Sequence, residues 1–323
     1  MPTERSGAGA DAPARPGDPS PACVTTVVPV PGDGPYAVAV AADGALWVTL
    51  ARSGELARIK DGEPARRHPA GGVSARPTVV APGPGARTMW VTQFLGDAIT
   101  GIDTVDGRTV RVPLDRGAGP FGIAAGPDGA MWFTELTADR VGRLPHPGPA
   151  LDGRPPAVET FPLPVRAAGA AGITAGADGA MWFALSQADA IGRVGTDGSV
   201  RLHRLPTPGA RPVDITAAPD GTLWFTENGV GRIGRITGDG QVDEVALPGG
   251  AATRPHGVAA AADGGCWFTA WGTRRIGRVT PAGRVRTYEL PPGVSEPHGI
   301  VTAGTDTVWT ATESGELVRL TPR

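Results

Sequence analysis

Several residue types that often point to a function are scarce in this chain of 323 residues. Lys60 is the only lysine, so arginine carries nearly all of the positive charge, and the formal net charge is −2. A chain so close to neutral has no general attraction for nucleic acid or an anionic membrane, and we expect neither as a partner. The only cysteines, Cys23 and Cys266, lack metal-ligand spacing, which argues against a disulfide scaffold and a zinc site. No apolar run approaches the length of a membrane span.

The first 22 residues contain no apolar core of the kind that a signal peptide needs, and they are rich in Pro, Ala, Gly and charge. This composition predicts a disordered leader over residues 1–22 and a folded domain over residues 23–323. We therefore expect a soluble, cytoplasmic protein. The whole chain has 49 glycines and 34 prolines beside 40% hydrophobic residues, which indicates many turns that join short apolar segments.

One phrase recurs along the chain and is centred on tryptophan. Seven tryptophans follow one another at spacings of 43, 42, 50, 42, 43 and 42 residues, and an eighth, Trp271, falls outside the series. A regular period of this length is typical of a repeat architecture. The seven are Trp47, Trp90, Trp132, Trp182, Trp224, Trp267 and Trp309.

Each repeat divides into four short segments. In the third repeat, Phe121–Ala125 and Ala130–Thr134 flank an Asp-Gly turn, and Val141–Leu144 follows about nine residues after the tryptophan. A fourth segment runs outward into a Pro-rich loop. Four strands in each of seven repeats predict an all-β fold, a seven-bladed β-propeller in which the repeated aromatic residues fill the space between blades.

The two ends of the chain are expected to meet. The last repeat stops just after its third strand, and Cys23–Pro31 is predicted to be the missing fourth strand of that blade. This strand would close the ring and remove an exposed sheet edge. The single spacing of 50 residues is explained by an insertion at 145–158 in an outer strand or loop.

Residues that break the repeat are the candidates for function. The innermost strand of each blade begins 11 residues before the tryptophan (12 for Trp90), at Tyr36, Thr78, Phe121, Ala171, Val213, His256 and His298. Only the last two blades carry histidine there. Glu296 lies two residues before His298, and Glu313 lies four residues after the last tryptophan of the series.

These residues meet at one mouth of the central channel, with Tyr36 next in ring order. Two carboxylates with open positions suit Mg²⁺, which takes oxygen ligands and keeps several waters. A neutral imidazole nearby is the right group to remove a proton near pH 7.

At these positions the chain resembles the streptogramin B lyases, also called virginiamycin B lyases. The matching phrases are GPYAV at 34–38, RPHGV at 254–258, WFTAWGTRRIGRV at 267–279, EPHGI at 296–300 and VWTATE at 308–313. The resemblance implies a Mg²⁺-dependent enzyme that opens a cyclic depsipeptide antibiotic at its ester bond by elimination and so gives antibiotic resistance. It also implies that His298 is the general base, that His256 and Tyr36 contact the substrate, and that Glu296 and Glu313 hold Mg²⁺.

The chemistry implied by the resemblance is consistent in itself. An ester oxygen on the β-carbon of a threonine unit belongs to a carboxylate leaving group, so removal of the α-proton expels it and leaves a double bond. Because that proton is a weak acid, the developing enolate must be stabilised by the cation. No nucleophilic serine is needed, and the sequence has no G-x-S-x-G motif.

Three positions depart from the family pattern. Ala270 stands where the family phrase usually has Glu, Leu50 where a polar residue is common, and Thr310 in place of the repeated Phe. Two other functions therefore stay open: a metal-dependent lactone hydrolase, and a non-catalytic propeller that binds a peptide, glycan or protein. Product mass separates the two enzymes, because elimination gives an isomer of the substrate and hydrolysis adds one water.

Some polar residues receive no function. His68, His146 and His203 fall in outer strands or loops and are expected to be ordinary surface histidines. Asp214 and Glu227 are expected to face the same mouth as the candidate site, without nameable partners. The repeated arginine of the third strand is interpreted as structural. With no long exposed apolar stripe, we expect a monomer.

Overall fold

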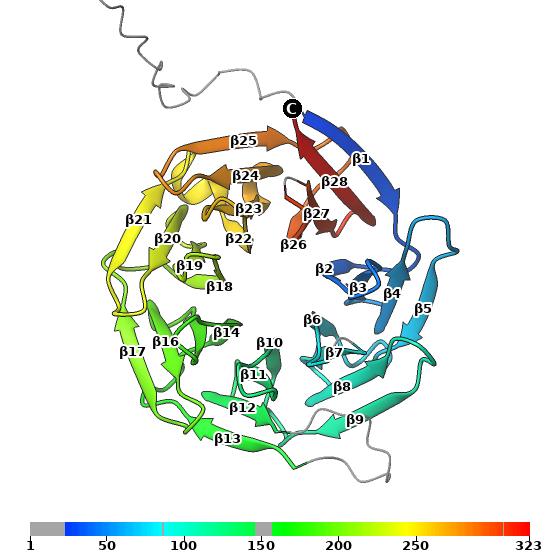
Figure 1. Ribbon diagram of the computed structural model, residues 1–323, viewed down its shortest axis with the longest axis horizontal. Coiled ribbons are helices and arrows are strands. Elements are labelled where there is room, and N and C mark those ends of the chain that lie inside the picture. Colours follow the sequence, from blue (N-terminus) through cyan, green and yellow to red (C-terminus); the bar gives the residue numbers. More distant parts are fainter. Residues whose placement is uncertain (1–22, 86, 146–156, 306) are drawn as a thin grey trace, which may run out of the picture.

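The computed structural model describes residues 23–85, 87–145, 157–305 and 307–323, and it forms a ring of seven sheets around a central channel (Figure 1). Each sheet has four antiparallel strands, and in six of the seven they follow sequence order from the channel outward. The predicted seven-bladed β-propeller is therefore confirmed. The expected leader, residues 1–22, and His146 lie outside the described residues, as does most of the insertion at 145–158.

The blades are numbered here from the first complete one along the chain. Blade 1 is β2 (Pro35–Val40), β3 (Leu46–Leu50), β4 (Glu55–Ile59) and β5 (Arg66–Pro69), and blade 2 is β6 (Pro77–Pro82), β7 (Thr88–Gln93), β8 (Ala98–Asp103) and β9 (Thr109–Pro113). Blade 3 is β10 (Pro120–Ala125), β11 (Met131–Glu135), β12 (Arg140–Leu144) and β13 (Glu159–Pro162), and blade 4 is β14 (Ala170–Ala175), β15 (Met181–Leu185), β16 (Ala190–Val194) and β17 (Val200–Arg204). Blade 5 is β18 (Pro212–Ala217), β19 (Leu223–Glu227), β20 (Arg232–Ile236) and β21 (Val242–Ala246), and blade 6 is β22 (Pro255–Ala260), β23 (Cys266–Ala270), β24 (Arg275–Val279) and β25 (Val285–Glu289). Blade 7 is β26 (Pro297–Ala303), β27 (Thr307–Thr312), β28 (Glu316–Pro322) and β1 (Cys23–Pro29).

The ring closes as the sequence predicts. Strand β1 pairs with β28 in antiparallel register from Cys23↔Pro322 to Pro29↔Glu316. The outermost strand of blade 7 therefore comes from the other end of the chain (Figure 1). Closure of this kind joins the first and last blades and pairs an edge that would otherwise be open.

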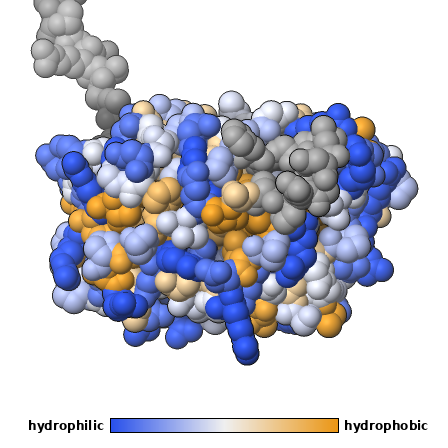
Figure 2. All heavy atoms as spheres, turned by 90° about the horizontal axis from the view of Figure 1, so that it is seen from below, coloured by the Kyte–Doolittle hydropathy of each residue, from blue (hydrophilic) through white to orange (hydrophobic). Residues whose placement is uncertain are grey.

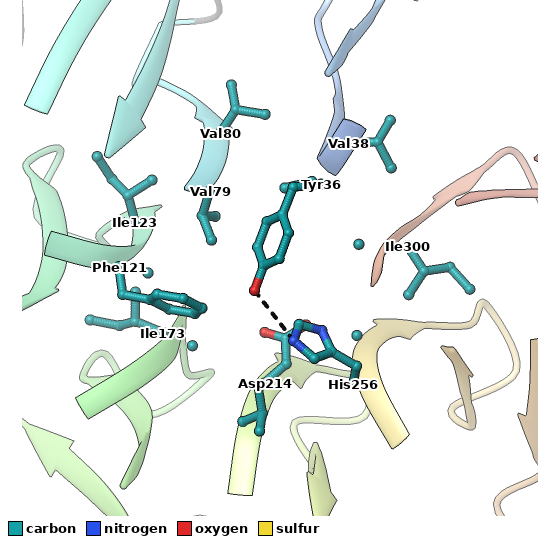
Figure 3. Close-up of a pocket in the computed structure, with 16 residues that line it drawn as sticks. Tyr36, Val38, Val79, Val80, Phe121, Ile123, Ile173, Asp214, His256 and Ile300 are labelled. Carbon is teal, nitrogen blue, oxygen red and sulfur yellow. Dashed lines mark hydrogen bonds between the residues drawn. The ribbon is translucent and has the colours of Figure 1, made fainter. Parts of the chain in front are cut away.

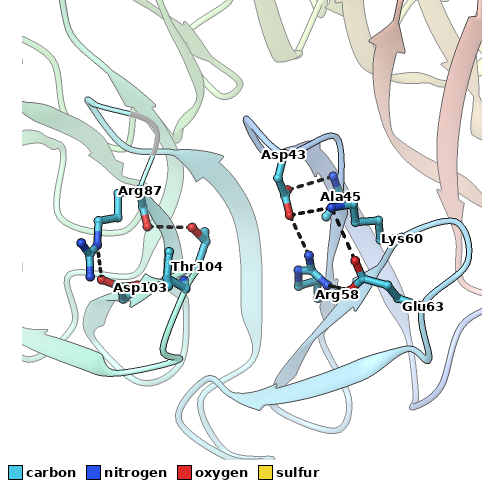
Figure 4. Close-up of polar contacts among 9 residues, drawn as sticks. Asp43, Ala45, Arg58, Lys60, Glu63, Arg87, Asp103 and Thr104 are labelled. Carbon is cyan, nitrogen blue, oxygen red and sulfur yellow. Dashed lines mark hydrogen bonds and ion pairs between the residues drawn. The ribbon is translucent and has the colours of Figure 1, made fainter.

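The repeated Asp-Gly turn and the repeated arginine form one structural unit. In blade 3, Asp128 Oδ1 accepts hydrogen bonds from Ala130 N and from Trp132 Nε1, and its Oδ2 accepts one from Arg143 Nε at 2.7 Å. The guanidinium of Arg143 lies 5.7 Å from the centre of the Trp132 ring. Figure 4 shows the equivalent pair in blade 1, where an arginine and the turn aspartate are 2.6 Å apart. The repeated arginine pairs with the turn aspartate in blades 1, 3, 4 and 6, whereas Arg235 of blade 5 pairs with Asp243 of the outermost strand.

The core lies between neighbouring blades. Trp132 of blade 3 packs with Met181 and Phe183 of blade 4, and all three are fully buried. The glycine of the repeated Ile-Gly-Arg segment makes this packing possible: a Cβ atom on Gly142 would lie 2.2 Å from the Phe133 ring. Glycine there lets each aromatic ring lie flat against the third strand of its own blade.

Two of the expected surface histidines are structural instead. His68 stacks on Trp47 with ring centres 4.8 Å apart, and His203 stacks on Trp182 at 5.2 Å. The same outer-strand position holds Phe161 in blade 3, which stacks on its own tryptophan. Burial lowers the pKa of both imidazoles, so they pack as neutral aromatic rings.

Helical structure in the described ranges is limited to two short 3-10 turns, η1 (Gly250–Thr253) and η2 (Trp271–Thr273), both on the loops of blade 6. None of the helices described is long and apolar enough to cross a membrane. Seen from the side, the molecule is a flat drum whose wall carries apolar groups in patches between hydrophilic side chains (Figure 2).

Candidate functional site

The mouth of the channel is the rim at which the innermost strands begin. In blade 7 the innermost strand starts near His298, and Glu296 lies two residues before it. The equivalent residue of every blade has left-handed backbone, with φ between +45° and +68°: Gly34, Arg76, Gly119, Gly169, Arg211, Arg254 and Glu296. Left-handed backbone costs about 1 kcal/mol or more for a residue with a side chain, and three blades use glycine there. The other four blades keep a residue with a side chain there, and Glu296 is the one acidic residue among them.

The two histidines lie next to each other on adjacent blades. Their rings are 4.6 Å apart and nearly perpendicular. Each backbone carbonyl is held by a threonine of the preceding blade: Thr226 Oγ1 donates to His256 O at 3.0 Å, and Thr269 Oγ1 donates to His298 O at 2.8 Å. The fold therefore fixes the backbone positions from which both imidazole side chains extend.

Tyr36 of blade 1 completes this group from the other side. Its hydroxyl lies 3.3 Å from Nε2 of His256, and its ring lies 4.6 Å from that of His298. Figure 3 shows the tyrosine pointing across the channel toward His256. Burial raises the pKa of the Tyr36 phenol, so the hydroxyl keeps its proton at neutral pH.

Glu313 sits between the candidate base and an arginine. Its Oε1 lies 2.7 Å from Nε2 of His298, and its Oε2 lies 2.6 Å from Nη2 of Arg52 on blade 1. The first contact is poorly aligned for a hydrogen bond, and neither ring nitrogen of His298 has a hydrogen-bond partner among the described residues. Arg52 was not identified from the sequence, because its contact with Glu313 spans the seam between blades 7 and 1.

Glu296 lies beside Glu313. Its carbonyl accepts the N–H of Glu313 at 3.2 Å, and its carboxylate has no hydrogen bond or ion pair within the part of the chain that the structure describes. No cluster of three or more His, Cys, Asp or Glu able to hold a metal occurs among those residues. Mg²⁺ is commonly held by only one or two carboxylates, with waters and substrate as the other ligands. The unpaired carboxylate of Glu296, on a residue whose backbone is hydrogen-bonded to a second glutamate, fits that pattern.

Both histidines are neutral at pH 7. Burial lowers the pKa of His298 to about 4. Burial, and then the neighbouring His298, lower the pKa of His256 to about 3. A neutral imidazole has a free lone pair and can act as a base, which a protonated ring cannot do.

A cavity of about 130 Å³ lies within the channel beneath the aromatic residues. Asp214 lines it, and its carboxylate accepts hydrogen bonds from Ile215 N and Val258 N. Burial raises the pKa of Asp214 to about 6. The partners of Asp214, which could not be named from the sequence, are thus backbone N–H groups of its own strand and of blade 6.

Glu227 does not face the mouth, contrary to expectation. The residue is fully buried, and neither oxygen of its carboxylate has a hydrogen-bond partner among the described residues. Burial, and then the nearby carboxylate of Glu244, raise its pKa to about 8.

The three departures from the family pattern are all buried. Leu50 and Ala270 are fully enclosed and supply no polar group to the site. Thr310 donates a hydrogen bond to Gly299 O at 2.8 Å, next to His298. Trp271, the tryptophan outside the series, lies 6.3 Å from the His298 ring, and its position four residues after Trp267 matches that of Glu313 after Trp309. That shared offset could have identified it.

Comparison with known proteins gives one family. The profile of the virginiamycin B lyase family matches residues 22–320. A virginiamycin B lyase of Nocardia farcinica is 39% identical over 140 residues, which are 40% of this chain and 47% of that protein. That of Saccharopolyspora erythraea is 47% identical over 51 residues, 16% of this chain and 17% of the other. The matched segments thus span less than half of these curated relatives.

Solved structures match over nearly the whole ring. The virginiamycin B lyase of Staphylococcus aureus is 30% identical with a TM-score of 0.86, and the match covers 94% of this chain and all of that one. A catalytically inactive histidine-to-alanine variant of that enzyme with Quinupristin is 29% identical, with the same TM-score and coverage. From the family profile, together with this agreement in structure, the chain belongs to the virginiamycin B lyase family.

Proposed function

We propose that this protein opens a cyclic depsipeptide of the type B streptogramin class at its ester bond by β-elimination, with Mg²⁺ as cofactor. The observation that carries the proposal is the contact between a neutral, buried imidazole and an acid: His298 Nε2 lies 2.7 Å from Glu313 Oε1, and Glu296 lies alongside. The family membership and the Quinupristin complex of the S. aureus enzyme support the substrate class.

The base is the first part of the mechanism. His298 takes the α-proton of the threonine-type unit, and the electron pair of that C–H bond forms the double bond between Cα and Cβ. The bond from Cβ to the ester oxygen breaks, and the oxygen leaves as a carboxylate. Glu313 stabilises the imidazolium that forms, because a carboxylate close to a charged ring favours the charged state. No water enters the product.

The other residues hold the substrate in position. His256 and Tyr36 form a hydrogen-bonded pair, and the protonated phenol supplies a donor for a carbonyl of the ring. Glu296 and Glu313 would hold Mg²⁺, which when bound supplies positive charge beside the carbonyl next to Cα. A fixed charge there favours removal of the α-proton, because it stabilises the charge that develops on the oxygen.

Turnover of Quinupristin by the purified protein, with and without Mg²⁺, tests this proposal. We expect ring opening by the wild type, and a loss of at least about 100-fold in kcat for His298→Ala, since general-base catalysis contributes about that much or more. His203→Phe is the matched control, because that imidazole packs against a tryptophan far from the mouth. A fully active His298→Ala variant would overturn the assignment of the base. Action as a cytoplasmic monomer stays a prediction.

A further inference from the structure

We propose that the mouth contains a second, apolar subsite formed by Phe94, Leu95 and Phe121, and that it binds an apolar side chain of the depsipeptide ring. This inference rests on the function proposed above and names the part of the substrate that the subsite recognises. We call these three residues the apolar subsite.

Blade 2 differs from the other blades at the loop between its second and third strands. Four and five residues after the tryptophan it carries Phe94 and Leu95, two large apolar residues in succession. The leucine is 60% exposed. The other six loops carry at most one large apolar residue there: Ala51-Arg52, Leu136-Thr137, Ser186-Gln187, Asn228-Gly229, Trp271-Gly272 and Glu313-Ser314. Neighbouring apolar side chains that face solvent are a common mark of a binding surface.

A chain of aromatic contacts connects this loop to the candidate site. Phe94 meets Phe121 edge to face at 6.5 Å, and Phe121 meets Tyr36 in the same way at 6.4 Å. Figure 3 shows Phe121 and Tyr36 both pointing into the same channel. Gly119 lies between this loop and Thr137: a Cβ atom there would lie 2.3 Å from the Thr137 hydroxyl and 3.2 Å from the Phe94 ring. The subsite is therefore continuous with the residues that surround His298.

Backbone hydrogen bonds anchor the loop that carries Phe94 and Leu95, and a further exposed apolar residue lies near it. Phe94 N and Leu95 N donate to the carbonyls of Arg76 and Ala75, at 3.1 Å and 3.0 Å. Val73, two residues before Ala75, is 74% exposed and adds another apolar group to the same stretch of the rim. Such an anchored loop presents its side chains in one arrangement, which favours recognition of a rigid ring.

The candidate catalytic residues and the apolar subsite thus lie on different sides of the mouth, with Arg76 as a charged residue beside the subsite. Blades 6, 7 and 1 supply imidazoles, carboxylates and a guanidinium, whereas blades 2 and 3 supply the apolar subsite; Figure 1 shows β6 and β10 across the channel from β22. A cyclic depsipeptide has the same division, with polar ester and amide groups in the ring and apolar side chains outside it. The substrate is oriented with its ester over His298 and an apolar side chain on Phe94 and Leu95.

Steady-state kinetics with Quinupristin on Leu95→Ser and Phe94→Ser test the inference. We expect KM to rise about tenfold in each variant with kcat nearly unchanged, because the lost contact binds ground state and transition state alike. Val105→Ser is the matched control: that valine is 78% exposed on a turn at the opposite rim, and its KM should equal that of the wild type. Leu95→Ser alters only an exposed side chain, so it remains informative if Phe94→Ser does not fold.

The outcomes separate this inference from the proposed function. An active wild type whose KM is unchanged in Leu95→Ser and in folded Phe94→Ser would overturn the apolar subsite and leave the lyase intact. A wild type that neither turns over nor binds Quinupristin would overturn both. Light scattering after gel filtration adds a third result: a dimer that Leu95→Ser converts to a monomer, with KM unchanged, would show that a second copy of the chain covers this surface instead.

Discussion

Two glutamates at the same repeat position give a sharp prediction about stability. Glu135 and Glu227 each end the second strand of their blade, and both are buried. Glu135 Oε2 lies 2.6 Å from Nη2 of Arg140. In blade 5 the corresponding arginine, Arg232, pairs with Glu244 instead, at 2.5 Å, and the carboxylate of Glu227 has no hydrogen-bond partner in the part of the chain that the structure describes.

Burial raises the pKa of Glu227 from its ordinary 4.5 to about 8, and this direction sets the sign of the effect. Between these values the folded protein keeps a proton that the unfolded chain has released, so its stability falls as pH rises. The contribution is fully present below pH 4.5 and is lost as pH passes 8. Each pH unit in this window changes the free energy of unfolding by about 1.4 kcal/mol at most.

Glu227→Gln removes the carboxyl that holds this proton. We expect the free energy of unfolding of the variant to rise relative to that of the wild type as pH increases from 5 to 8.5. At pH 8.5 the difference should be about 1 to 4 kcal/mol. Glu135→Gln is the comparison: burial raises the pKa of Glu135 too, but its ion pair with Arg140 opposes this shift, so the variant loses the ion pair and should gain less stability than Glu227→Gln as pH rises. Urea denaturation across the range measures both. A Glu227→Gln variant whose stability follows the wild type at every pH would refute the reasoning.

Three further predictions concern the site and the outer strands. Arg52→Gln should tighten Mg²⁺ binding, measured by calorimetry, about two- to fivefold, because a mostly exposed ion pair worth about 1 kcal/mol no longer competes for the carboxylate of Glu313. Arg76→Gln should change Mg²⁺ affinity less, and equal effects of the two variants would contradict this reasoning. Thr269→Val should lower kcat about tenfold, because the backbone carbonyl of His298 loses the hydrogen bond that positions this residue. Thr134→Val loses a similar hydrogen bond of 2.6 Å in blade 3 and should affect stability alone. His203→Phe should raise the melting temperature at pH 5 more than at pH 8: a lowered histidine pKa means that stability is lost as pH falls below the ordinary value of 6.5.

The repeat carried most of the fold prediction. Blade number, strand order and the pairing of β1 with β28 follow from a period that turns position in the sequence into position in the ring. The same argument placed Tyr36, His256, His298, Glu296 and Glu313 at one rim, because equivalent offsets in each repeat lie at equivalent heights in the ring.

What could not be predicted depends on side-chain packing between blades. The ion pair of Arg52 with Glu313 crosses from blade 1 to blade 7 through two loops, and loop geometry has no periodic signal. Glu227 and Glu135 look identical in the sequence, yet the choice of partner by Arg232 decides which one is paired. The stacking of His203 was readable in principle, because Phe161 occupies the same place in the neighbouring blade.

The mass of the product formed from Quinupristin, resolved against unreacted substrate by chromatography, tests the central claim most directly. Elimination through His298 predicts an opened product with the same mass as the substrate, formed only when Mg²⁺ is present. A product heavier by one water would contradict the account and assign the site to a hydrolase.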